Sequence, residues 1–185
     1  MDRRHFVLAT LAAASAAATP AWAREAPPEV AADLPGARLL GAGRLRWFGL
    51  QVYDIRLWVA ADAPTGAASA DVARFPLALE IEYARALEGA RIAQQSIDEM
   101  TRVGGFSDNQ AKQWLAFLKQ TVPDVKARDR VTGVQRPLEL SRFHVNGRFA
   151  GELRDADFMR LFFGIWLSPQ TSQPALRSQL LGLGS

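Results

Sequence analysis

Arginine and tyrosine are the residue types with which this chain could do chemistry in an apolar environment. Arg44 and Arg46 stand two residues apart, so a regular strand would place both guanidinium groups on one face. The only tyrosines are Tyr53 and Tyr83. A guanidinium beside an apolar cleft can hold a carboxylate through two hydrogen bonds or stabilise an oxyanion. The alternative for either arginine is a solvated position on the wet face of a sheet.

Other chemistries lack the residues that they need. The sequence has no cysteine, which excludes disulfides, thiol nucleophiles and cysteine metal ligands. Of its two histidines, His5 lies in the N-terminal segment and His144 stands alone beside a predicted hairpin turn, so no metal site is predicted. The chain has no Gly-x-Ser-x-Gly motif of a serine hydrolase and no glycine run with the spacing of a dinucleotide loop. We therefore expect no cofactor.

The N-terminal segment has the pattern of an export signal. Arg3 and Arg4 precede an apolar run, residues 6–18, that is shorter than the roughly 20 residues of a membrane-spanning helix. Small residues follow, as signal peptidase requires, which predicts cleavage after Ala23. The paired arginines favour the twin-arginine route, and an ordinary secretory signal is the alternative. The absence of a cysteine for a lipid anchor then predicts a soluble periplasmic protein with no stable membrane insertion.

Size and charge are those of one domain that does not bind nucleic acid. Cleavage after Ala23 would leave 162 of the 185 residues, enough for a single sizeable core. The formal net charge of +3 is small and scattered along the chain, which argues against a nucleic-acid partner. Residues 24–37, with Pro27 and Pro28, are predicted to form a flexible lead-in. Residues 38–185 are predicted to form the domain.

Hydrophobic periodicity divides this domain into strands and helices. Residues 38–59 fit two strands broken near Gly49, and residues 75–83 alternate like a strand with one dry and one wet face. Residues 87–103 and 107–122 have helical spacing, and Ser107 with Gln110 forms a capping box. Strands return from residue 138, with a hairpin turn at Asn146 and Gly147, and two more helices follow before Gly182. This order is typical of an α+β fold with an antiparallel sheet and helices on one face.

Two segments resemble a known family. Gly41–Val59, GAGRLRWFGLQVYDIRLWV, and Phe158–Gly182, FMRLFFGIWLSPQTSQPALRSQLLG, are similar to an early Gly-x-Gly…Val-Tyr strand pair and a late Ile-Trp-Leu…Leu-Leu-Gly end in bacterial chalcone-isomerase-like proteins. The resemblance implies a curved antiparallel sheet covered by a layer of helices, with a ligand cleft between them. It also implies an early-strand arginine at the cleft, for which Arg44 and Arg46 are the candidates.

The sequence departs from the plant isomerases of this fold. These enzymes place a catalytic tyrosine, lysine and asparagine near the start of the first helix, and the corresponding run, residues 87–96, contains none of them. Their threonine before the Val-Tyr strand is also missing. No catalytic residue is therefore assigned. Arg91, inside that run, joins the two early arginines and the two tyrosines as a candidate for ligand binding.

Three functions remain open. The first is a non-catalytic carrier that binds a fatty acid or a similar amphipathic carboxylate between sheet and helices, as fatty-acid-binding members of the family do. The second is a cofactor-independent isomerase or intramolecular lyase acting on an unsaturated carbonyl compound, with Arg44 or Arg46 facing the oxyanion. The third is an envelope protein that uses its aromatic face to bind another protein and holds no small ligand.

Overall fold

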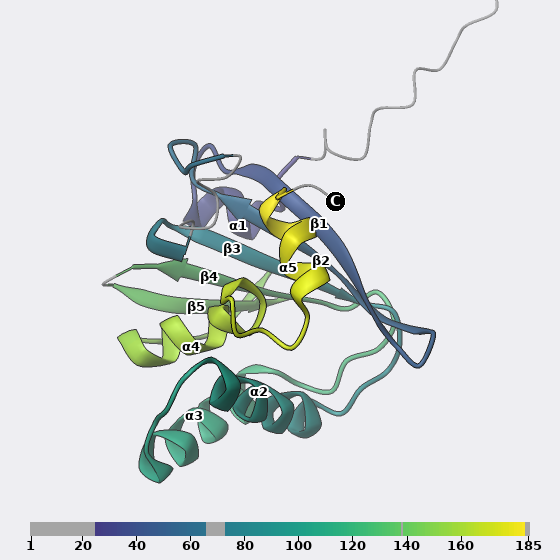
Figure 1. Ribbon diagram of the computed structural model, residues 1–185, viewed down its shortest axis with the longest axis vertical. Coiled ribbons are helices and arrows are strands. Elements are labelled where there is room, and N and C mark those ends of the chain that lie inside the picture. The colour runs from purple at the N-terminus through teal and green to yellow at the C-terminus, as the bar shows by residue number, and fades with distance from the viewer. Residues whose placement is uncertain (1–24, 66–72, 138, 184–185) are drawn as a thin grey trace, which may run out of the picture.

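The computed structural model of the protein describes residues 25–65, 73–137 and 139–183. The predicted export signal, residues 1–23, lies outside them. Six strands form one antiparallel sheet in the order β1-β2-β3-β4-β5-β6, so each strand pairs with its neighbours in sequence (Figure 1). The α+β class predicted from the sequence is confirmed. Within the described ranges, no helix is long and apolar enough to cross a membrane.

Alternating apolar side chains form the sheet. In the third strand Leu77, Leu79 and Ile81 point toward the helices, as the period of two predicts, and all three are buried. The turn expected near Gly49 consists of Phe48 and Gly49, and that at Asn146 and Gly147 is also present. The strands are β1 (Arg38–Trp47), β2 (Leu50–Val59), β3 (Leu77–Tyr83), β4 (Arg130–Arg136), β5 (Leu140–Val145) and β6 (Arg148–Leu153).

Four helices cover one face of the sheet. The capping box of Ser107 and Gln110 starts the third helix as predicted, and the Asp155 carboxylate caps the fourth by accepting a hydrogen bond from the Phe158 backbone N–H. The last helix packs on β1, and the second packs on the fourth. The helices on this face are α2 (Gly89–Val103), α3 (Asp108–Thr121), α4 (Ala156–Leu167) and α5 (Pro174–Leu181).

The main core lies between the sheet and α4. Phe158, Phe162 and Trp166 follow one another at intervals of four residues and are at most 8% exposed. Their rings are in contact: Phe158 stacks on Phe162 at 5.3 Å between centroids, and Phe162 meets Trp166 edge-on at 5.6 Å. Phe143 of β5 also packs against Phe158 and Phe162. The aromatic stripe seen in the sequence is therefore the surface through which α4 is attached to the sheet.

The prediction of a flexible lead-in over residues 24–37 is wrong for its described part. Pro28–Asp33 form helix α1, which packs on the sheet face opposite to the other helices. Val30 and Leu34 of this segment are buried against Trp58 and neighbouring strand residues. Two prolines and several alanines suggested disorder, whereas two well-spaced apolar residues were enough to dock the segment. The prediction of helices on one face holds for four of the five described helices.

The face predicted to be wet is instead partly covered under α1. Glu80 of β3 is only 3% exposed, because Trp58 Nε1 and Arg56 Nη1 donate to its carboxylate at 2.8 and 3.0 Å. Glu29 of α1 is buried beside Arg130, with 2.8 Å between the guanidinium and the carboxylate. Pairing with an opposite charge lowers the free-energy cost of burying each group, which is high for an isolated charge. The alternating acids of β3 therefore lie partly under a second packed layer, which the sequence pattern did not indicate.

Candidate functional site

Tyr53 and Tyr83 lie side by side on the face of the sheet that carries α2–α5. They are direct partners in the register of β2 and β3, so the antiparallel ladder holds their rings together. The two rings meet edge-on with 6.2 Å between centroids. Tyr83 is only 5% exposed, and Tyr53 is half-buried next to the same core. The structure thus brings together the only two tyrosines of the chain.

Helix α4 adds a polar atom to this pair. Trp166, near the end of α4, donates a hydrogen bond from its indole Nε1 to the Tyr53 phenol oxygen at 2.9 Å. The helix starts at the Asp155 cap and presents its aromatic stripe to the sheet, which places Trp166 over Tyr53. A buried tryptophan usually needs such an acceptor for its N–H. We call Tyr53, Tyr83 and Trp166 the tyrosine cluster.

The hydroxyl protons of this cluster have no acceptor among the described residues. Tyr53 accepts from Trp166 but donates to no described group, and the Tyr83 hydroxyl makes no hydrogen bond within the described chain. The Tyr83 oxygen is not among the fully buried side-chain atoms without a partner in the described residues, so its hydroxyl group is not sealed in the core. Two phenol O–H donors are therefore free to bind an oxygen atom from outside the described chain.

The pKa values keep both phenols protonated. Burial raises the pKa of Tyr53 to about 12; the hydrogen bond from Trp166 lowers it and the charge of Glu99 raises it by smaller amounts. Burial also raises the pKa of Tyr83 above its ordinary value of about 10, and the neighbouring Tyr53 adds to this rise. At neutral pH the cluster therefore offers hydrogen-bond donors and no negative charge of its own.

Glu99 of α2 is the ionisable group whose charge reaches the cluster. Its side chain is 18% exposed, and its carboxylate lies 3.7 Å from the Arg102 guanidinium, one turn further along the helix. That arginine is itself 64% exposed, so it shields Glu99 only from the solvent side. A ligand oxygen at the tyrosine cluster would thus lie near a carboxylate. This arrangement favours a neutral or protonated head group over a free anion.

The three candidate arginines do not join the tyrosines. Arg44 lies on the opposite face of β1, where its guanidinium forms a two-bonded ion pair with Asp54 of β2 at 2.6 and 3.1 Å. Arg46 is exposed near the β1–β2 turn. Arg91 is 81% exposed on α2 and pairs with Glu88 three residues before it.

The strand register explains the positions of the early arginines. Leu45, between them, pairs with Tyr53 on the inner face, so the alternation of β1 turns Arg44 to the outer face. Both arginines are exposed, and the ladder is irregular between Leu45 and Arg46, so spacing in the sequence could not tell which side of the strand each guanidinium would face. The expectation that one of them reaches the space between sheet and helices is not met in this structure.

Two surface hollows of the described chain are relevant, and neither is lined by the tyrosine cluster. One, of about 440 Å³, lies along β1 and β2 and includes Arg44, Arg56, Ile55 and Gln179 of α5. The other, of about 500 Å³, lies at the β5–β6 turn and includes Arg148 beside Val145 and Phe149. Both are open to solvent. In the first, Arg44 and Arg56 are already paired with carboxylates.

Sequence reasoning missed Trp166 as a site residue. It was assigned to the core stripe, which it does belong to, and its polar atom was not considered. A signal was available, since an indole N–H predicted to be buried on an apolar stripe must find an acceptor, and the chain has only two tyrosines to provide a phenol. Glu99 gave no signal, because a glutamate on an amphipathic helix is ordinarily solvated. No group of three or more His, Asp or Glu that could hold a metal occurs within the described ranges.

Sequence and structure comparisons place this architecture among known proteins. The model of the chalcone isomerase-like family matches residues 27–182, which is most of the chain. The chain belongs to the chalcone isomerase-like family. The resemblance found in the two segments is thereby confirmed, and so is the fold that it implies. The family match also includes α1, in agreement with its packing on the sheet.

The chain is also similar to two individual proteins. An uncharacterised protein of Haemophilus influenzae is 29% identical over 143 residues, covering 77% of this chain and 67% of its own. A crystal structure of a fatty-acid binding protein from Arabidopsis thaliana matches with a TM-score of 0.60 and 12% identity, over 80% of this chain and 87% of that one. At this identity the structural likeness shows a shared fold.

Proposed function

We propose that this chalcone isomerase-like protein is a non-catalytic binding protein for a fatty acid or a similar amphipathic molecule. The observation that carries the proposal is the pair of adjacent phenol groups, Tyr53 and Tyr83, whose O–H groups donate to no described acceptor beside an otherwise apolar core. The fatty-acid-binding protein of the same fold supports it by analogy. The carboxyl or carbonyl oxygen of the ligand would accept the two O–H bonds.

The acyl chain would lie along the aromatic stripe of α4. Phe162, Ile165 and Trp166 each keep 8% exposure, whereas Phe158 and Leu161 have none, so the stripe is most accessible at its tyrosine end. Met100 of α2 and Met159 of α4 are part of the same core and can change shape at small cost. Neither of the two surface hollows described above is lined by the cluster, so the proposed entry of a chain includes these side chains moving apart.

The charges around the tyrosine cluster determine whether the ligand's head group would bind in a neutral or an ionised form. Without an arginine in the cluster and with Glu99 nearby, we propose that the ligand binds as a protonated acid or as a neutral carbonyl compound. Affinity for a fatty acid should therefore rise as the pH falls. The methyl ester of the same acid should bind at neutral pH at least as well as the acid. This differs from a carrier that uses an arginine, for which the ester would bind less well.

The test is titration of the purified protein with a medium-chain fatty acid and with its methyl ester. We expect Tyr53→Phe and Tyr83→Phe each to lower affinity about 10-fold, the loss of one net hydrogen bond of about 1–1.5 kcal/mol. The matched controls Arg44→Met and Arg46→Met, on solvent-facing positions, should leave affinity unchanged. Equal affinity in the tyrosine variants, or loss of binding in an arginine variant, would contradict the site. Absence of binding in the wild type would remove this ligand class.

An isomerase is the second candidate that the same cluster supports. Two protonated phenols with raised pKa values could donate to the oxygen of a developing enolate, which is electrostatic stabilisation without a covalent step. An unsaturated carbonyl compound would then leave the protein as an isomer. Incubation with such compounds, followed by chromatographic separation of isomers, tests it. Turnover that disappears in Tyr53→Phe would favour the enzyme over the carrier.

A further inference from the structure

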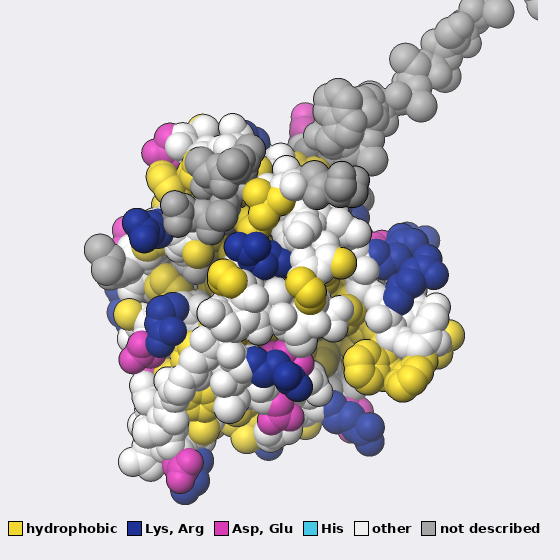
Figure 2. Space-filling model, in the orientation of Figure 1, with side chains coloured by type: hydrophobic (Ala, Val, Ile, Leu, Met, Phe, Trp, Pro, Cys, Tyr) yellow, Lys and Arg dark blue, Asp and Glu magenta, His cyan; other side chains and the backbone are white. Residues whose placement is uncertain are grey.

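The β1–β2 hairpin exposes large apolar side chains at its tip. Trp47, Phe48 and Leu50 are 62%, 90% and 60% exposed, in a stretch of four residues. The rings of Trp47 and Phe48 meet edge-on at 5.2 Å, so they form one apolar surface. Figure 2 shows apolar side chains gathered at the outer end of this hairpin. Such a cluster on an exposed turn marks an interaction site more often than an accident of the fold. We call Trp47, Phe48 and Leu50 the hairpin tip.

The hairpin tip extends beyond the rest of the sheet. The pairing of β2 with β3 begins at Tyr53, so β1 and β2 continue past it as a two-stranded arm (Figure 1). No described residue outside the arm forms a hydrophobic cluster with the tip. The side chains of the hairpin tip can therefore contact a lipid layer or another protein without any rearrangement of the domain.

Backbone conformation at the tip runs against the residue type. Phe48 and Gly49 have φ of 47° and 80°, which are the angles of a two-residue hairpin turn with both central residues left-handed. Asparagine, aspartate or glycine is preferred at the first of these positions, and an aromatic residue there is strained. Phe48 is thus a bulky apolar residue at a position where neither packing nor turn geometry requires one. Strain of this kind concentrates at functional positions.

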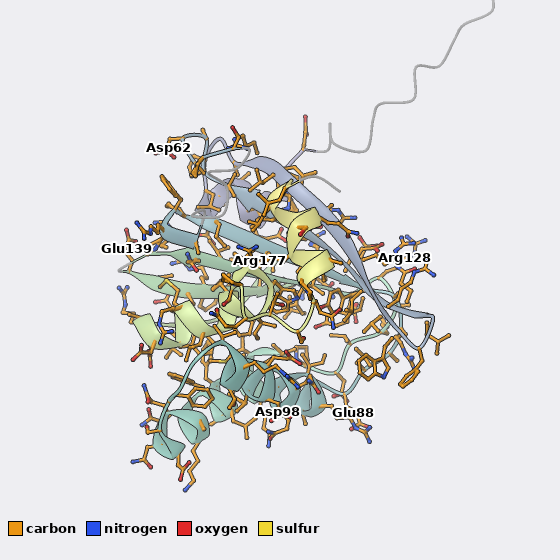
Figure 3. All side chains as sticks on the ribbon, in the orientation of Figure 1. Asp62, Glu88, Asp98, Arg128, Glu139 and Arg177 are labelled. Atoms are coloured by element: carbon orange, nitrogen blue, oxygen red, sulfur yellow. The ribbon has the colours of Figure 1, made fainter. Side chains whose placement is uncertain are left out.

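Unpaired arginines surround the base of the arm. The Ala84 N–H donates to the Val52 carbonyl, and the Arg128 N–H to the Tyr83 carbonyl, so Arg85 and Arg128 lie beside the hairpin. Figure 3 shows Arg128 next to it, and Arg46 lies within the arm itself. In the described part of the chain, these three exposed guanidinium groups form no ion pair, whereas the nearby acids Asp54 and Glu88 are each paired.

We propose that the hairpin tip docks on a lipid bilayer that contains anionic lipids. Tryptophan prefers the interface between head groups and acyl chains, and Phe48 can enter the acyl region below it. The three arginines would then face the phosphate groups, whose charge is opposite to theirs. This surface is independent of whether a fatty acid binds in the core. We favour a bilayer over a protein, because the three arginines near the arm form no ion pair in the described chain, while Asp129 beside Arg128 already accepts hydrogen bonds from the Lys126 backbone and Asn146.

Vesicle co-sedimentation tests the proposal. The purified protein, in the same chain form for every variant, is mixed with vesicles of phosphatidylcholine alone or with added phosphatidylglycerol. We expect binding to the mixed vesicles, weakened by salt. Phe48→Asn should reduce vesicle affinity about 10-fold or more, since burial of one phenylalanine is lost, while the turn becomes more favourable. The matched control is Phe149→Asn, which changes another exposed phenylalanine, 61% exposed against 90% for Phe48, on β6 at the other edge of the sheet.

Charge and self-association complete the test. Arg46→Gln combined with Arg85→Gln should remove the preference for anionic vesicles, and Arg154→Gln, another exposed arginine, should not. Failure of the wild type to sediment, or equal binding by Phe48→Asn and the wild type, would overturn the proposal. Concentration-dependent dimers without lipid that Phe48→Asn dissociates would also overturn it, in favour of a contact between copies. The fatty-acid titration uses no vesicles, so the two proposals fail separately.

Discussion

At the scale of single residues, two phenol groups distinguish this chain from an ordinary sheet-and-helix domain. The register of β2 and β3 makes Tyr53 and Tyr83 neighbours, and Trp166 reaches one of them from another layer. Each of the three is explained by local packing, but together they leave two O–H donors unused. These two donors lie side by side, where one ligand oxygen could accept from both.

Alkaline titration provides a direct check on this burial. The pKa of both tyrosines is raised in the folded protein, whereas the unfolded chain titrates near pH 10. The phenols therefore stabilise the fold below about pH 10, and this contribution is lost as the pH rises from there to about 12 for Tyr53. We expect little phenolate absorbance at pH 10 in the native protein and a cooperative increase only on unfolding. A simple titration centred near pH 10 would show that the tyrosines are exposed.

At the scale of elements, α1 is the part that the sequence described least well. Its composition, with adjacent prolines and alanines, is that of a linker, and its only strong signals are Val30 and Leu34. Val30 and Leu34 pack on residues between Trp58 and Val134, and Glu29 pairs with Arg130 101 positions later, so no local pattern contains these partners. By contrast, β3, the α3 capping box and the Asn146–Gly147 turn were predictable, because their causes lie within a few residues.

The same reasoning applies to the candidate site. The tyrosines were identified because the chain has only two, and the helix bearing Trp166 was identified from its spacing. The face of β1 on which Arg44 lies was not predictable, since it depends on the register and on the irregularity between Leu45 and Arg46. The position of Glu99 was not predictable either, because it depends on the packing of α2 against α4.

Breaking the contact of α1 should destabilise the whole domain. Glu29 is 1% exposed at its side chain and accepts hydrogen bonds from Arg130 and Thr132. Glu29→Gln removes the charge that balances a partly buried guanidinium, so we expect a loss of about 3 kcal/mol in the free energy of unfolding, by chemical denaturation. The matched control is Glu139→Gln, on an exposed pair with Arg136, which should cost less than about 0.5 kcal/mol. Equal stability of the two variants would mean that α1 is not docked in solution.

At the scale of the whole molecule, location is the property that links the two proposals. A binding protein with an arm for lipid surfaces is useful where membranes lie on both sides, and the N-terminal pattern predicts the periplasm. The hairpin tip and the tyrosine cluster lie at the same end of β2, because Tyr53 is three residues from Leu50. A docked protein would therefore hold its ligand-binding core next to the bilayer.

Export can be tested on the intact chain. We expect the mature protein to be recovered from the periplasm with a mass that begins at Arg24, since the apolar run ends before small residues suited to signal peptidase. Replacing Arg3 and Arg4 with lysine should retain the precursor in the cytoplasm if the twin-arginine route is used. Unchanged export of that variant would indicate the ordinary secretory route, and retention of residues 1–23 in the periplasmic protein would contradict cleavage.

The order of the strands also bears on how the molecule would respond to mechanical force. The first strand, at one edge of the sheet, follows directly after α1 and is covered by α5, the last helix, so both ends of the described chain meet at β1. A pull on these ends would load α5 and β1 first. Since every strand is bonded only to its sequence neighbours, the ladders would then open one after another, as a zipper does, and not resist together.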